Sequence, residues 1–153
     1  ANKAIGIKNG PSHTEIIITG EGPKIVEIGA RLGGDCITTH LVPLSTGVDM
    51  VECNIRIAMG EKPDISCKYN RGSAIRYLST ENGVIKNIKG LDAAKKTDGV
   101  VQVSIVHNVG DRVDGIKSSG DRVGFVIAQG RNAAEAIKSA ESALSTIKVE
   151  VHK

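Results

Sequence analysis

The sequence predicts an α+β fold in two parts: a β-hairpin with helices, followed by a small antiparallel sheet domain with two helices. Three observations support this prediction. Two β-branched runs, TEIIIT and KIVEIGA, lie close together near the start of the chain. The spacing of apolar residues then becomes helical, and beyond a segment with a proline between charges it alternates again as in strands. We take that segment, EKPDIS, as the linker between domains at 1–63 and 64–153.

The first part begins with two strands joined by the turn sequence GEGP, whose residues favour a tight hairpin. Two helical pieces follow, the first interrupted by Pro43 and the second ending at Gly60. The expected elements are strands at 14–19 and 24–30 and helical pieces at 36–45 and 48–60.

The second part alternates strands with two helices. An E-N-G turn is expected to send its second strand back along the first. Asn132 and Glu135 form an N-x-x-E capping box before an Ala-rich, amphipathic helix. The expected strands are 72–80, 84–90, 100–109, 122–130 and 148–151, and the expected helices are 91–97 and 133–147.

The composition argues against several classes of function. Aromatic residues make up 2% of the chain, too few for the stacking platform of a single-stranded nucleic-acid binder. The net charge is +3 and the basic residues are scattered, so we expect no nucleic-acid partner. No apolar stretch is long enough to span a membrane. The three cysteines, without a C-x-x-C pair, are typical of reduced thiols in a cytoplasmic protein.

Glu15 and Glu27 are the first candidate site residues. If the hairpin loop has three residues, Glu15 lies directly opposite Glu27, with Cβ atoms about 4.5–5.5 Å apart. Two such carboxylates repel each other unless one is protonated or a cation lies between them. Carboxylates without thiols or clustered imidazoles suit a hard ion, Mg²⁺ or Mn²⁺. Two alternatives stay open: both residues are solvated surface residues, or a four-residue loop puts them on opposite faces.

Arg31 is expected on the same face as Glu27, because side chains alternate along a strand and Gly29 lies midway between them. Gly29 leaves room on that face. The guanidinium of Arg31 is a fixed fork of donors that suits a phosphate or a carboxylate. The hairpin therefore combines a carboxylate pair with a nearby positive group.

The order of these parts resembles the last part of the catalytic core in the ATP-grasp ligases, over roughly residues 9–63. That family has a Glu in one strand, then a strand reading E-x-N-x-R, then helices with a T-G-x-D step and an A-x-G ending. The counterparts here are Glu15, EIGAR at 27–31, TGVD at 46–49 and AMG at 58–60. The strand EIGARLGGD is most similar to the L-amino-acid ligase-like branch.

By this resemblance, Glu15 and Glu27 would hold the Mg²⁺ (or Mn²⁺) ions that bridge the phosphates of ATP. Arg31 would be the catalytic residue that steadies the transferring phosphate or the acyl-phosphate. This sequence departs from the family at Gly29, where many members have a metal-binding Asn. Water or substrate would then supply the missing oxygen.

The substrate-binding candidates follow from the same resemblance. Relatives place substrate-contacting groups where this chain has Gly33, Gly34 and Asp35. An N-cap for the next helix explains Asp35 equally well. His13 is a further candidate, although a solvated histidine in a turn is the more common case.

The tail from SSGDRVGFVIAQG onward is similar to the small C-terminal domain that follows the core in L-amino-acid ligase-like members. It is also similar to the corresponding end of phosphoribosylamine–glycine ligase. The implied reaction has ATP phosphorylate a small-molecule carboxylate, after which an amine attacks the acyl-phosphate to give an amide and ADP.

The sequence contains neither a Walker loop nor the upstream half of such ligases, with its nucleotide-binding lysines and Gly-rich lid. We therefore expect a C-terminal fragment that is inactive alone and whose partner is the missing N-terminal half. The second domain would pack against the core or support a homodimer. Two alternatives remain: a fragment of phosphoribosylamine–glycine ligase, and a non-catalytic binding or assembly module.

Overall fold

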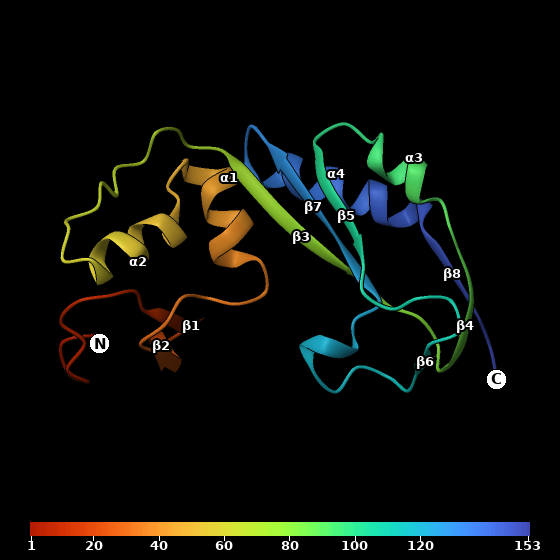
Figure 1. Ribbon diagram of the computed structural model, residues 1–153, viewed down its shortest axis with the longest axis horizontal. Helices are drawn as coiled ribbons and strands as arrows, with labels where there is room; N and C mark the ends of the chain where they lie inside the picture. The colour runs from red at the N-terminus through yellow and green to blue at the C-terminus, as the bar shows by residue number, and fades with distance from the viewer. The chain divides into compact units, whose positions relative to one another are not determined.

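The computed structural model describes residues 1–153, which form two compact units. Unit 1 comprises Ala1–Pro43 and Gly47–Lys68, and unit 2 comprises Leu44–Thr46 and Tyr69–Lys153. Figure 1 labels the helices and strands of both. The structure has the mixed α and β composition that the sequence predicts, with small antiparallel sheets. None of the helices combines the length and the hydropathy that crossing a bilayer requires.

Unit 1 consists of a hairpin and a helical segment. The strands β1 (His13–Thr19) and β2 (Gly22–Gly29) form a two-stranded antiparallel sheet. The helical segment contains the π-helix η1 (Ile37–Leu41), α1 (Val42–Thr46), whose end belongs to unit 2, and α2 (Met50–Ala58). Both helical pieces lie where the sequence predicts them.

The hairpin turn is one residue shorter than predicted. Thr19 pairs with Gly22, so only Gly20 and Glu21 lie between the strands. The Thr19 hydroxyl donates to the Gly22 carbonyl oxygen and accepts from the Glu21 N–H. Gly22 adopts a left-handed backbone, at φ 101°, as the first residue of β2. Neither the three-residue loop on which the expected pairing was conditional nor the four-residue alternative is formed.

Pro43 joins two helices rather than breaking one. Proline has no N–H to donate, and Pro43 lies in the first turn of α1, where that donor is not needed. The turn before it is wound as a π-helix, in which the Leu41 N–H donates to the Cys36 carbonyl oxygen at 2.9 Å. After Gly47 ends α1, Asp49 caps α2 by accepting from the backbone N–H groups of Val51 and Glu52.

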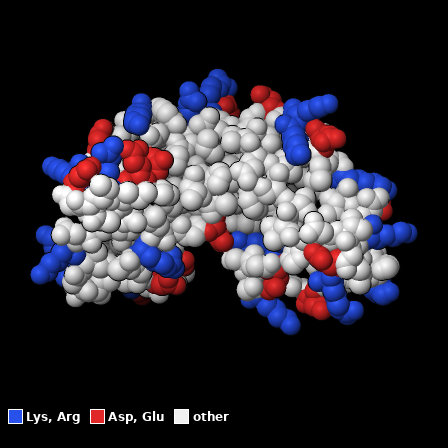
Figure 2. Space-filling model, viewed as in Figure 1, with Lys and Arg blue, Asp and Glu red and all other residues white.

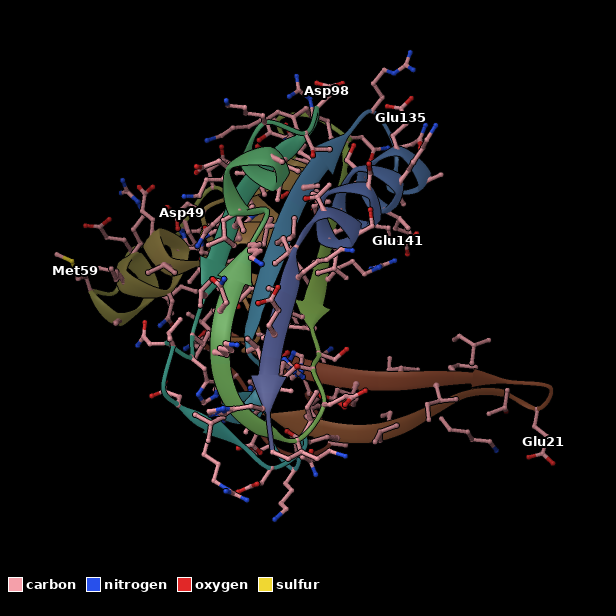
Figure 3. All side chains as sticks on the ribbon, turned by 90° about the vertical axis from the view of Figure 1, so that its right-hand side faces the viewer. Glu21, Asp49, Met59, Asp98, Glu135 and Glu141 are labelled. Carbon is pink, nitrogen blue, oxygen red and sulfur yellow. The ribbon has the colours of Figure 1, made fainter.

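Unit 1 buries few side chains: its buried residues are Thr38, Val48 and Cys53. Apolar side chains of both strands are exposed instead, namely Ile16, Ile17, Ile18, Ile25 and Val26. Figure 3 shows Glu21 at the tip of the hairpin and Met59 projecting at the end of α2, where its side chain is 70% exposed. A two-stranded hairpin with exposed apolar faces is only marginally stable alone.

Unit 2 contains two three-stranded antiparallel sheets, ordered β3-β7-β5 and β6-β4-β8. The predicted return of the second strand along the first is wrong, because β3 pairs with β7 and β4 pairs with β6 and β8. The strands are β3 (Gly72–Leu78), β4 (Gly83–Lys89), β5 (Val100–Ile105), β6 (Arg112–Val113), β7 (Gly124–Gly130) and β8 (Lys148–His152). The helices are α3 (Leu91–Lys95), the 3₁₀ turn η2 (Ser119–Asp121) and α4 (Ala133–Thr146).

The hydrophobic core of unit 2 lies between α4 and the sheet of β3 and β7. Three alanines of α4, Ala136, Ala140 and Ala143, are fully buried. Their spacing of four and three residues puts them on one helix face, and their small side chains let the helix approach the strands closely. Outside this face, Glu141 forms an ion pair with Arg76 of β3 at 3.0 Å.

The start of α4 is capped as the sequence predicts. The Asn132 side chain accepts from the Glu135 backbone N–H at 3.0 Å. The Glu135 carboxylate in turn accepts from the backbone and the guanidinium of Arg131. These bonds to Arg131 hold the pKa of Glu135 below its usual value. The N-cap bond of Asn132 is therefore found as predicted, but the reciprocal bond of the capping box is not, because the Glu135 carboxylate accepts from the Arg131 N–H and not from that of Asn132.

Candidate functional site

Five of the predicted site residues come together at the end of the hairpin away from the turn. Glu15 of β1 is the direct partner of Glu27 in β2. His13 forms a hydrogen bond with Glu15, and Arg31 forms one with Glu27. Gly33 lies against the His13 ring. The strand ends therefore carry two facing carboxylates with a basic group beside each.

Val26 brings the two glutamates into register. Between the turn and the Ile16–Ile25 pair, the residues of the two strands pair in the register set by the two-residue loop. The register then shifts by one residue, so that Glu15 pairs with Glu27. Val26 is the extra residue of this β-bulge. Without it Glu15 would pair with Val26, and Glu27 would project from the other face of the hairpin. The predicted pairing of Glu15 with Glu27 is thus found, but through a bulge that the sequence did not reveal.

Each carboxylate uses one oxygen for a basic neighbour, His13 on β1 or Arg31 two residues after the end of β2. Glu15 Oε1 lies 3.2 Å from His13 Nε2, and Glu27 Oε1 lies 3.0 Å from Arg31 Nη2. The second oxygen of each carboxylate has no hydrogen-bond partner in the chain. Both glutamate side chains are just over half exposed, at 53% and 54%, so these ion pairs contribute little stability. The free oxygens remain open to a ligand from solvent.

Gly29 makes the position of Arg31 possible. A Cβ at Gly29 would lie 3.3 Å from Arg31 Cγ and 3.5 Å from its Nε, so a larger side chain would displace the arginine. Arg31 also donates through Nη1 to the Leu32 carbonyl oxygen at 3.0 Å. The departure from the E-x-N-x-R pattern therefore gives the guanidinium its place over β2.

Gly34 and Asp35 lie in the loop after the cluster. A Cβ at Gly34 would meet no atom within 4 Å. Asp35 and Cys36 both adopt left-handed backbone, with φ of 50° and 61°, which is unusual for successive residues other than glycine. The N-cap interpretation of Asp35 is wrong, because Cys36 holds that position and makes no side-chain cap. Burial, and then the charge of Asp35, raise the pKa of the Cys36 thiol, which therefore stays protonated.

The carboxylate pair fits the protein's share of a magnesium site. Mg²⁺ is commonly held by one or two carboxylates together with water and substrate phosphates. Glu15 and Glu27 offer two hard oxygen donors directly opposite each other. No group of three or more His, Cys, Asp or Glu side chains is placed to hold an ion. The remaining ligands would have to come from water, from phosphate or from another part of the protein.

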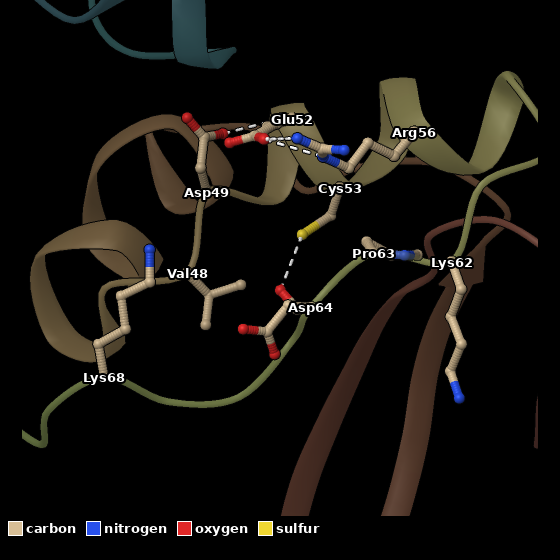
Figure 4. A pocket seen from close by; sticks show the side chains of 9 residues that line it. All are labelled: Val48, Asp49, Glu52, Cys53, Arg56, Lys62, Pro63, Asp64 and Lys68. Carbon is tan, nitrogen blue, oxygen red and sulfur yellow. Dashed lines mark hydrogen bonds and ion pairs between the residues drawn. The ribbon is translucent and has the colours of Figure 1, made fainter.

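A separate pocket of about 290 Å³ lies in unit 1 beside α2, and Figure 4 shows its lining residues. Cys53 Sγ lies within it, 3.8 Å from the Asp64 carbonyl oxygen. Glu52 and Arg56, which line it, form an ion pair at 2.8 Å, whereas Lys62 and Lys68 in the same lining form none. Hydrogen bonds from Ser66 hold the pKa of Asp64 below its usual value. None of the predicted site residues lines this pocket.

Figure 2 shows the charged side chains on one face of the molecule. On the face drawn in Figure 2, basic and acidic side chains alternate and no continuous basic stripe is seen.

The sequence matches the family described as L-amino acid ligase C-terminal domain 2 over residues 76–152, which is half of the chain. The chain therefore belongs to this family. The matched residues begin in β3 and end in β8, so they cover the sheets and the long helix of unit 2. The predicted site residues lie upstream of them.

Known proteins extend the likeness to the rest of the chain. The L-arginine-specific L-amino acid ligase of Bacillus subtilis is 29% identical over 119 residues, which are 76% of this chain and 29% of that protein. The structure of an L-amino acid ligase from Bacillus licheniformis covers 99% of this chain with 38% of its own, at a TM-score of 0.82 and 20% identity. The structure of a phosphoribosylglycinamide synthetase from Anaerococcus prevotii matches 99% of this chain with 39% of its own residues, again at a TM-score of 0.82 and 20% identity.

These comparisons confirm the predicted relationship to the ATP-grasp ligases and the predicted fold. At 20% identity the solved structures show the fold alone. The chain spans about a quarter to a third of the length of the curated relatives it matches. The comparisons do not test the roles of individual site residues, which stay predictions.

Sequence reasoning placed the site residues but missed two of their contacts. His13 and Glu15 are two residues apart in a strand, so their shared face could have been read from alternation alone. The return of Arg31 onto Glu27 depends on the chain path after β2 ends at Gly29, and no sequence pattern indicates that path.

Proposed function

We propose that the chain is the C-terminal part of an ATP-dependent carboxylate–amine ligase of the L-amino-acid ligase type. The observation that carries this proposal is the direct pairing of Glu15 with Glu27, with Arg31 beside them. Membership in the L-amino acid ligase C-terminal domain family supports the same reaction class. In this reaction a carboxylate is phosphorylated by ATP, and an amine then displaces the phosphate to form an amide.

The residues of the cluster have complementary roles in this reaction. Glu15 and Glu27 would hold Mg²⁺, which neutralises the charge of the ATP phosphates. Arg31 carries five N–H donors in a planar fork, which can bind the phosphate oxygens while the group is transferred. The contact of Arg31 with Glu27 keeps the fork beside the carboxylate pair before substrate binds. The cluster thus combines metal ligands with a phosphate-binding group.

The rest of the ligase would come from a further part of the polypeptide that packs on unit 1. Its hairpin exposes apolar side chains on both strands, and unit 1 buries only three of its residues. These isoleucines are 51–78% exposed, so burying the rest of each would be worth on the order of 1 kcal/mol. The relatives are about three times as long as this chain, which agrees with a further nucleotide-binding part. We expect the chain alone to be inactive, and its three free cysteines fit a cytoplasmic enzyme.

The test is ATP-dependent hydroxamate formation with hydroxylamine, which traps an acyl-phosphate. It is made with the polypeptide as its source expresses it, and with residues 1–153 alone for comparison. A panel of L-amino acids should give product, and Glu27→Gln should lower the rate about 100-fold. His152→Ala, an exposed change in unit 2, is the control. Formation of ADP without trapped product from any carboxylate would contradict the proposal.

Phosphoribosylamine–glycine ligase is the second candidate, because the phosphoribosylglycinamide synthetase structure matches this chain as well as the L-amino acid ligase structure does. Both reactions pass through an acyl-phosphate, so they differ in the acceptor amine. Supplying glycine with phosphoribosylamine in the same assay separates them. Turnover of that pair, with no turnover of amino acid pairs, would favour this candidate.

A further inference from the structure

We propose that His13 is a positioning residue, which fixes the Glu15 carboxylate opposite Glu27 and whose ring fits only because residue 33 is glycine. This inference deepens the proposed function, because it assigns a support to one of the two proposed metal ligands. It replaces the direct substrate contact that the sequence suggests for His13 and Gly33.

His13 contacts Glu15 on the same strand. Both lie on β1 two residues apart, so their side chains share one face. His13 Nε2 lies 3.2 Å from Glu15 Oε1, and the other carboxylate oxygen stays free. The His13 side chain is only 17% exposed, whereas that of Glu15 is 53% exposed. The more buried histidine can therefore restrict the more exposed carboxylate.

The His13 ring also packs against Gly33. A Cβ on Gly33 would lie 2.9 Å from His13 Nδ1 and 3.4 Å from its Cε1, closer than side chains normally pack. The backbone of Gly33 is not left-handed, so its conformation alone does not require glycine. Glycine is needed at this position for the space that the imidazole occupies.

Gly33 is held in place by a hydrogen bond from Thr38. The Thr38 hydroxyl donates to the Gly33 carbonyl oxygen at 2.8 Å, and Thr38 is buried with 5% of its surface exposed. This bond ties the loop after β2 to the start of the helical segment. The contacts thus run from Thr38 through Gly33 and His13 to Glu15.

The two ring nitrogens have different surroundings. Nε2 contacts Glu15 Oε1, while Nδ1 faces Gly33, so a hydrogen bond to the ionised carboxylate requires the tautomer that donates through Nε2. A partner that orients a ligand in this way commonly changes metal affinity about 10- to 100-fold when it is removed. His13 would act through Glu15 without touching metal or substrate.

The first test needs no metal. Imidazole ¹⁵N spectra of the full chain should show His13 protonated at Nε2. Gly33→Ala should shift these signals, because its methyl group displaces the ring. Gly20→Ala is the matched control, since a Cβ there meets no atom within 4 Å and lies in the turn. An unchanged His13 spectrum in Gly33→Ala would overturn the proposal.

The second test measures the affinity of the chain for Mn²⁺ alone, from paramagnetic broadening of amide signals. His13→Leu and Gly33→Ala should each weaken binding about 10-fold, and the double variant should weaken it no further. His13→Gln retains a donor and should recover part of the loss. Additive losses, or equal affinity in His13→Leu and the unchanged chain, would refute the positioning role.

The two proposals fail in different ways. If Mn²⁺ binds at Glu15 and Glu27 but His13→Leu has no effect, only the role of His13 is wrong. If the ¹⁵N spectra behave as expected but Mn²⁺ does not bind at these glutamates, His13 still orients Glu15, and the proposed metal site is wrong.

Discussion

Glu15 lies directly opposite Glu27 across the hairpin because Val26 is an extra residue in β2. The two-residue turn alone would have put the carboxylates on opposite faces, and the bulge restores the facing pair. Two like charges in directly paired positions reduce the stability of a sheet. This arrangement is therefore costly without a cation, and it is consistent with a site that holds one.

The first prediction concerns that cost. In the absence of divalent ions, Glu15→Gln should stabilise the hairpin by about 0.5 kcal/mol or less, because one of the facing charges is removed from a half-exposed pair. The glutamine can still accept a hydrogen bond from His13. The rates of amide hydrogen exchange in β1 and β2, measured with a chelator present, report the stability of the hairpin. Faster exchange in the variant would contradict repulsion between the two glutamates.

The second prediction concerns the alanine face of α4. Ala140 is fully buried against the sheet, so Ala140→Leu should lower the free energy of unfolding by about 1–3 kcal/mol through overpacking. Ala134→Leu, at an exposed position of the same helix, should change it little. Urea denaturation followed by circular dichroism compares the two. Equal stabilities would mean that the helix does not pack as described.

The third prediction concerns the N-cap of α4. Asn132→Ala removes the acceptor for the Glu135 N–H and should cost about 1 kcal/mol. Asn132→Asp keeps an acceptor and should retain most of the stability. Thermal unfolding of the three proteins provides the measurement, and an aspartate variant as unstable as the alanine variant would argue against the cap.

The fourth prediction is a pH dependence at Asp121. The N–H groups of Lys117 and Ser118, and the Ser118 hydroxyl, donate to its carboxylate and hold its pKa below the usual value. The folded state therefore favours the charged form. This stabilisation is present above the ordinary aspartate pKa of about 3.9 and is lost as the pH falls through the lowered value.

The variant Asp121→Asn tests the direction of this pH dependence. The variant should be less stable than the unchanged chain at neutral pH, and the difference should shrink in strong acid, where Asp121 is protonated. Denaturation curves at both pH values measure the difference. A difference in stability that stays constant with pH would show that the charge of Asp121 does not stabilise the folded state.

Local patterns predicted most of the fold. The alternation in GSAIRYL and the capping box at Asn132 were sufficient for β3 and α4, because periodicity and caps are properties of short segments. The pairing of β3 with β7 was missed, since strand order depends on contacts distant in sequence. The E-N-G turn suggested a hairpin with β4, but it connects strands of different sheets.

The candidate site was predicted in part for the same reason. The facing of Glu15 and Glu27 was expected from strand pairing, whereas the bulge at Val26 that produces it has no signature in the residue types. Arg31 lies two residues beyond the end of β2, so alternation along the strand does not explain its contact with Glu27. The contact of His13 with Gly33 also escaped, because it joins β1 to a loop that follows β2. Sequence indicated which groups are present, and the chain path decided which of them meet.

The most direct test of the account is paramagnetic broadening by Mn²⁺ in the ¹⁵N-labelled full chain, because it detects even weak binding at known residues. The account predicts that Mn²⁺ first broadens the amide signals of residues 13–16 and 26–31, that excess Mg²⁺ reverses the effect, and that Glu15→Gln and Glu27→Gln each abolish it. Broadening that first affects the acidic residues around α2, or that persists in both variants, would contradict a metal site between Glu15 and Glu27.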